Sequence, residues 1–185
     1  MKNVKSIMLS VVVFTQTTSS QNNNHKYYLE GNICGGVQKN YPVTGIGGAF
    51  GFFISSNSSI DLRTREVYSF QNKTIIGAIT VNYRYHFNNG LFVGTGFAHH
   101  HEIFEEHFLN QPAEAALGSH HEISHRSGLN FEAGYNFKSL SKKGFFSCIY
   151  PTTNVIASYM FLDRSMNPLV TINFGFRIGL NKNKP

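Results

Sequence analysis

The chain has few charged residues and lacks a long apolar run. Asp, Glu, Lys and Arg make up 14% of its 185 residues, whereas about 25% is usual in soluble proteins, so the chain is poorly equipped to solvate its own surface. No stretch after residue 20 approaches the roughly 18 consecutive apolar residues that indicate a membrane-spanning helix. A closed β-barrel is the other structure that satisfies every backbone polar group in lipid.

Cysteines are scarce, and basic residues do not form a cluster. Cys34 and Cys148 are the two cysteines; an oxidising compartment would allow them to pair, but we expect two unpaired, inward-facing thiols on non-adjacent strands. The net charge of +6 comes from scattered residues, and no RNA-recognition motif, zinc finger or helix-turn-helix is present. We therefore expect no nucleic-acid partner.

Residues 1–20 have the features of a secretory signal peptide. Lys2 and Lys5 precede the apolar run Ile7–Phe14, and small polar residues follow as far as Ser20. The apolar run is well short of the about 20 residues that a spanning helix needs. We expect residues 21–185 to form one domain.

The alternation of apolar and polar residues is clearest between Ser124 and Phe137. One parity carries Leu129, Phe131, Ala133, Tyr135 and Phe137, and the other carries Arg126, Gly128, Asn130, Glu132, Gly134 and Asn136. A period of two predicts a β-strand with one apolar and one polar face. A single strand of this kind also fits a soluble sheet, so the barrel interpretation depends on finding the pattern repeatedly.

The pattern recurs along the chain and predicts eight strands. They span residues 27–38, 46–54, 59–70, 75–87, 91–98, 124–137, 145–161 and 170–180. We expect a loop at 40–45, a long extracellular loop at 99–123, and a bulge at Pro151, which has no N–H to donate. The fold class is therefore all-β, an eight-stranded antiparallel transmembrane up-and-down β-barrel with one long extracellular loop.

The inner face of this barrel should be filled and charged. An eight-stranded barrel is just wide enough for side chains to occupy its interior. The charged residues on the inward parity are Glu30, Asp61, Arg63, Arg65, Arg84, Arg126, Glu132 and Arg177. We expect these groups to pair into a polar network that plugs the lumen.

These strands resemble the small eight-stranded outer-membrane barrels of Gram-negative bacteria, the OmpA/OmpX-like group, over residues 25–181. The resemblance implies an outer-membrane location, outer-membrane lipid as a partner, and a non-enzymatic surface role. One departure is the end of the chain: such barrels usually finish on an aromatic residue, whereas Phe176 and Leu180 are followed here by Asn-Lys-Asn-Lys-Pro.

The histidines are concentrated in one part of the sequence. Seven of the nine, together with five glutamates, lie between residues 99 and 125: His99, His100, His101, His107, His120, His121 and His125, with Glu102, Glu105, Glu106, Glu114 and Glu122. Imidazoles with carboxylates are preferred ligands of zinc and copper. We take His99, His100, His101, His107, His120 and His121 as the candidate metal ligands; the alternative is a polar loop that binds no metal.

The sequence of this loop fits more than one kind of partner. Adhesion to an extracellular ligand, a subunit role in a larger envelope complex and metal capture all fit its composition. Within the loop, residues 102–117 are a helix candidate interrupted at Pro112.

A second hypothesis is enzymatic. His125-Arg-Ser127 places a His and a Ser on one face of one strand, which resembles the lipid A deacylases of the PagL group. The resemblance implies an ester hydrolase that uses His125 and Ser127 on the barrel exterior. Such a site needs an acid to orient the histidine, for which we consider Glu102, and the Ser-Asn usual in that group is Ser127-Gly128 here.

Overall fold

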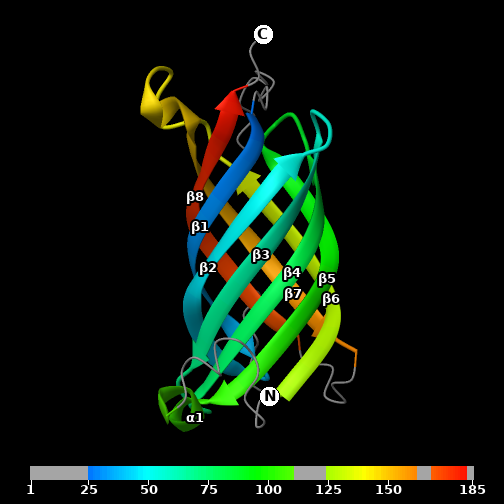
Figure 1. The fold of residues 1–185 in the computed structure, drawn as a ribbon, viewed down its shortest axis with the longest axis vertical. Helices are drawn as coiled ribbons and strands as arrows, with labels where there is room; N and C mark the ends of the chain where they lie inside the picture. Colours follow the sequence, from blue (N-terminus) through cyan, green and yellow to red (C-terminus); the bar gives the residue numbers. More distant parts are fainter. Residues whose placement is uncertain (1–24, 111–123, 162–167, 183–185) are drawn as a thin grey trace, which may run out of the picture.

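A computed structural model describes residues 25–110, 124–161 and 168–182 (Figure 1). The predicted signal peptide lies outside the described residues. The strands are β1 His25–Gln38, β2 Tyr41–Phe53, β3 Ser58–Ser69, β4 Thr74–His86, β5 Leu91–Phe104, β6 Ser124–Asn136, β7 Ile149–Met160 and β8 Leu169–Lys182. A short helix, α1 (Glu105–Asn110), follows β5, and a 3-10 turn, η1 (Phe145–Cys148), precedes β7.

The eight strands close into an antiparallel barrel in which each strand pairs with its neighbours in sequence. The ring is closed by β1 and β8, whose register runs from His25 opposite Lys182 to Val37 opposite Val170. The predicted fold class is therefore confirmed. No helix in the described parts of the chain is long and apolar enough to cross a membrane.

The two ends of the barrel differ in what they carry (Figure 1). We call them the His25 end, where β1 begins and β8 finishes, and the α1 end, where α1 follows β5. The His25 end also bears the β2–β3, β4–β5 and β6–β7 connections.

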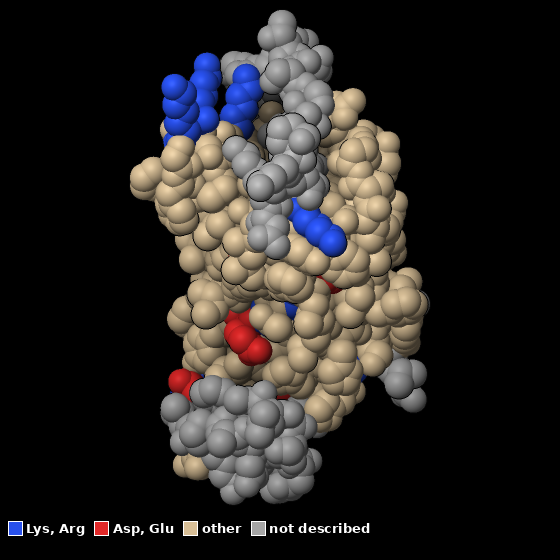
Figure 2. All heavy atoms as spheres, turned by 45° about the horizontal axis from the view of Figure 1, so that its top comes forward, with Lys and Arg blue, Asp and Glu red and all other residues tan. Residues whose placement is uncertain are grey.

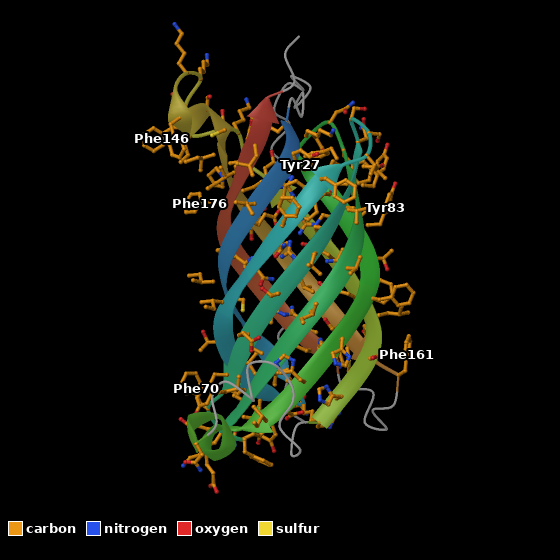
Figure 3. All side chains as sticks on the ribbon, in the orientation of Figure 1. Tyr27, Phe70, Tyr83, Phe146, Phe161 and Phe176 are labelled. Carbon is orange, nitrogen blue, oxygen red and sulfur yellow. The ribbon has the colours of Figure 1, made fainter. Side chains whose placement is uncertain are left out.

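The pattern of burial is the reverse of that in a soluble protein, because charged side chains are buried inside and large apolar side chains are exposed outside. The outward parity exposes Ile33, Ile46, Phe50, Leu62, Val81, Phe97, Phe131, Val155, Ile172 and Phe174, and the wall between the two ends bears few charged groups (Figure 2). Aromatic side chains lie near both ends, with Tyr27 and Tyr83 toward the His25 end and Phe70 and Phe161 toward the α1 end (Figure 3). An apolar band flanked by aromatic residues is typical of transmembrane barrels.

The expected loop at residues 40–45 is wrong, because residues 41–45 belong to β2. Lys39 and Asn40 alone make the turn, with φ of 49° and 68°, and a two-residue hairpin of this kind needs positive φ at both positions. Gly45 pairs with Cys34, and a Cβ built on it would lie 2.0 Å from the Glu66 carbonyl oxygen. This glycine permits a close approach of strands, so it does not mark a loop.

The expected loop at 99–123 begins too early. Strand β5 continues to Phe104, so His99, His100 and His101 are strand residues paired with β6. The helix candidate at 102–117 is correct in part, since α1 covers Glu105–Asn110, and residues 111–123 lie outside the described part of the chain.

The region before β7 also differs from the expectation. Residues 145–148 form η1 and not the start of the strand, so Cys148 lies in this turn and is not a lumen thiol, whereas Cys34 is buried inside as predicted. The expected bulge at Pro151 is absent, because the β7–β8 register continues unshifted from Ile149 opposite Ile178 to Ser158 opposite Leu169.

Candidate functional site

The lumen is crossed by a network of paired charges centred on Glu30. The carboxylate of Glu30 accepts hydrogen bonds from Arg63 Nη2 at 2.5 Å, Arg84 Nη1 at 2.7 Å and Arg177 Nη2 at 2.6 Å. These side chains come from β1, β3, β4 and β8, and each is at most 5% exposed. Charge-assisted bonds of this kind are shorter and stronger than neutral ones.

Two further carboxylates, Glu132 and Asp61, pair with Arg84. Arg84 bonds Glu132 through Nε at 2.8 Å and Nη2 at 2.7 Å, and its Nε lies 2.9 Å from Asp61 Oδ2. Asn154 also donates to Glu132, and Asn82 donates to Asp61 at 3.0 Å. The prediction that Glu30, Asp61, Arg63, Arg84, Glu132 and Arg177 face inward and pair is confirmed.

Arg65 is buried without a carboxylate partner among the described residues. It donates to Thr171 Oγ1 at 2.6 Å and Ser158 Oγ at 3.0 Å. Arg126 lies near the α1 end, where its Nη2 is 3.9 Å from Glu102 Oε2.

Aromatic side chains and glycines fill the lumen beside the charges. Arg177 lies over the Tyr28 ring at 4.4 Å, and Arg84 lies over Phe92 at 4.8 Å. The Tyr28 ring occupies the space above Gly51, where an added Cβ would be 2.2 Å from Cζ. The sequence analysis did not identify Tyr28 and Phe92 as lumen residues. Each lies on the same parity of its strand as inward-facing polar residues, and this was the signal that could have identified it.

The lumen contains no continuous opening along the described residues. A layer of apolar side chains lies toward the α1 end: Cys34, Val43, Val67, Ile76 and Leu169. The cavities at the two ends of the lumen are each about 10 Å³, about enough for one water molecule. The barrel is therefore a plugged one.

The outer wall near the α1 end carries a cluster of polar side chains, which we call the histidine cluster: His99, His101, His125, Ser127 and Glu66. His99 Nδ1 lies 3.2 Å from Ser127 Oγ, and His99 Nε2 lies 3.2 Å from His125 Nδ1. The two imidazole rings are stacked, with centroids 5.3 Å apart. The adjacent strands β5 and β6 hold these residues in register, with His99 opposite Ser127.

His101 extends the cluster toward β3. It stands opposite His125 in the β5–β6 ladder, and its Nε2 is 4.0 Å from Glu66 Oε1. The ring of His101 lies across Gly77 of β4, where a Cβ would be 2.0 Å from Nε2. Glu66 interrupts the apolar exterior, a position that a transmembrane barrel tolerates near an interface.

The six candidate metal ligands do not all come together. His99 and His101 face outward, whereas His100 is 4% exposed and faces the lumen, because successive strand residues point to opposite faces. Nothing is described of the His107 side chain, and His120 and His121 lie outside the described residues. Within the described residues, no group of three His, Cys, Asp or Glu converges on a metal position.

The His125–Ser127 pair of the enzymatic hypothesis has a different geometry from the expected one. Ser127 contacts His99 and not His125, which lies on the far side of the His99 ring. Glu102 has the opposite parity and contacts Arg126, so the expectation that it orients His125 is wrong.

Comparisons with known proteins identify relatives of the fold only. No protein-family model and no curated protein matches the chain. Among solved structures, the N-terminal β-barrel domain of Pseudomonas aeruginosa OprF is similar at a TM-score of 0.50 and 14% identity, over 86% of this chain and 99% of that domain.

Two further barrels are similar in the same way. Neisserial surface protein A aligns at a TM-score of 0.52 and 8% identity, over 85% of this chain and 97% of that one. OprG, an outer membrane protein of Pseudomonas aeruginosa, aligns at 0.51 and 11% identity, over 86% and 99%. The fold is thus that of small eight-stranded outer-membrane barrels.

Proposed function

We propose that the chain is a non-enzymatic outer-membrane surface protein whose His25 end faces the periplasm and whose α1 end faces outward. The observation that carries this proposal is the inverted burial, with paired charges inside and an apolar wall outside. A wall of this kind is stable in lipid, because the closed ring leaves no unpaired strand edge. The plugged lumen favours a surface or binding role over transport through the barrel.

Membrane insertion can be tested with the folded protein in phospholipid vesicles. Protease added outside should spare the strands and cut only the connections that it can reach. The unheated protein should also migrate differently from the boiled protein on a gel. Complete digestion in vesicles, with no difference between heated and unheated samples, would refute the membrane location.

We further propose that the histidine cluster binds a divalent transition metal, Zn²⁺ or Cu²⁺. The observation that supports this metal site is the 3.2 Å separation of His99 Nε2 and His125 Nδ1. Two nitrogens bound to one tetrahedral zinc at about 2.0–2.1 Å would lie about 3.3–3.4 Å apart. This separation suits two nitrogens that bind the same ion, once each ring has turned its lone pair toward that ion.

Calorimetric titration with Zn²⁺ tests the metal proposal. The double variant His99→Ala/His125→Ala should lose a micromolar site, whereas His25→Ala, at the opposite end, should keep it. Binding should weaken at acidic pH, because only neutral imidazole binds the ion. Equal heats of Zn²⁺ binding for the wild type and the double variant would show that the cluster is a polar patch that binds no metal.

The ester-hydrolase alternative retains one supporting observation, the 3.2 Å contact between Ser127 Oγ and His99 Nδ1. In this version His99 replaces His125 as the base that accepts the serine proton. Ser127→Ala should then abolish release of fatty acid from lipid A by the producing cell. Identical lipid A in cells that carry the wild type and the variant would end this alternative.

A further inference from the structure

The β6–β7 connection projects away from the barrel wall at the His25 end (Figure 1). Its serines hold the backbone: Ser139 Oγ donates to the Ser141 carbonyl at 2.9 Å, Ser141 Oγ to that of Lys143 at 3.0 Å and Ser147 Oγ to that of Gly144 at 2.7 Å. Leu140 N also bonds the carbonyl of Ile149 at 2.9 Å. These bonds join backbone groups of residues 139–149 without using the larger side chains.

Those larger side chains are cationic and aromatic. Lys138, Lys142 and Lys143 are all exposed, and no Asp or Glu occurs between Glu132 and Asp163. The other two connections at this end, residues 54–57 and 87–90, also lack carboxylates, and Lys and Arg side chains gather at the His25 end in Figure 2. The lysines therefore lack acidic neighbours within their own connection, which leaves them suited to an anionic partner.

The two phenylalanines of the turn η1 are exposed at this end of the barrel. Phe145 is 68% exposed and Phe146 58% exposed, and their rings pack edge to face with centroids 5.7 Å apart. Phe146 lies toward the same end as Tyr27 and Tyr83 (Figure 3). Two exposed aromatic rings beside lysines have the composition of an element that lies at a membrane interface.

We propose that residues 137–148 form a lipid anchor, in which Lys138, Lys142 and Lys143 bind the phosphate groups of anionic phospholipids. Phe145 and Phe146 enter the acyl chains of the same leaflet. Long lysine side chains reach the headgroups while their stems stay against apolar surface. The proposal rests on the membrane location proposed above and adds the class of lipid that the His25 end selects.

The absence of Trp from the chain provides a direct test. Phe146→Trp introduces a single indole, whose fluorescence in vesicles should be quenched by brominated phospholipid. Brominated phosphatidylglycerol should quench it more than brominated phosphatidylcholine at the same mole fraction. Each lysine near an anionic surface should contribute about fivefold to association, and the preference should decline at high salt.

Two matched variants make the outcome decisive. Adding Lys138→Gln, Lys142→Gln and Lys143→Gln to Phe146→Trp should abolish the preference for phosphatidylglycerol, whereas adding Lys39→Gln and Lys73→Gln, at the α1 end, should preserve it. Equal quenching by the two lipids without the lysine substitutions, or a preference that survives them, would overturn the anchor.

A second indole position separates failure of the anchor from failure of the membrane location. Phe50→Trp places the indole on the barrel wall, where Phe50 is 48% exposed, and both brominated lipids should quench it equally. If this position is quenched and Trp at position 146 is not, the barrel is inserted and the anchor is refuted. If neither is quenched, the membrane location itself is wrong and the anchor fails with it.

Discussion

Glu30→Gln is expected to destabilise the barrel strongly, because Glu30 is the shared partner of three buried arginines. In this network Arg63, Arg84 and Arg177 pair with Glu30, Asp61 and Glu132, so its three positive charges match its three negative ones, while Arg65 bonds Thr171 and Ser158. Losing one carboxylate leaves one buried positive charge uncompensated. Removing one partner of a buried ion pair costs about 3–5 kcal/mol, and we expect a decrease of that size in the free energy of unfolding.

Urea titration of the protein in phospholipid vesicles, with the folded fraction read from the unheated gel band, measures this change. Glu30→Gln/Arg177→Met is the informative control, since Glu30 is the carboxylate partner of Arg177 among the described residues. The double variant restores the charge balance and should recover part of the lost stability. A single variant within about 0.5 kcal/mol of the wild type, the range of ordinary surface substitutions, would refute the reasoning.

Three further outcomes follow from the packed lumen and the closed sheet. Planar-bilayer recordings should show no large stable conductance, because charged and apolar layers close the lumen; porin-sized steps would contradict this. Gly51→Val should lower the free energy of unfolding by about 1–3 kcal/mol, as overpacking does, because its Cβ would lie 2.2 Å from Tyr28 Cζ; an unchanged urea midpoint would count against it. Circular dichroism in detergent should be mostly β, and a strong helical signal would exclude the barrel.

The barrel was predictable from the sequence because its two faces differ in chemistry at almost every strand position. In β6, Leu129 and Phe131 alternate with Asn130 and Glu132, and a one-residue shift would place Glu132 in the apolar wall. The same alternation predicted that the charged residues face the lumen. Strand ends were harder to place where small residues replace the alternation, as in β2, where Gly45 resembles a loop residue but allows strands to approach closely.

The histidine cluster was predictable in composition but not in geometry. His99, His100 and His101 interrupt the apolar parity of β5, so nothing in the alternation indicated that the strand continues through them. Because β5 continues through these residues, His100 points to the opposite face of the sheet from His99 and His101. The contact between His99 and Ser127 depends on the β5–β6 register, which the long connection between these strands does not specify.

The pairing of β1 with β8 also has a kinetic consequence. Val37 and Val170 are partners in this seam, so the contacts that close the ring join residues from opposite ends of the chain, and folds dominated by such distant contacts form slowly. Until β8 arrives, the outer edges of β1 and β7 present unpaired N–H and C=O groups, which are costly in lipid. The strands should therefore enter the membrane and close together, so that the pairing of β1 with β8 sets the moment at which the barrel becomes stable.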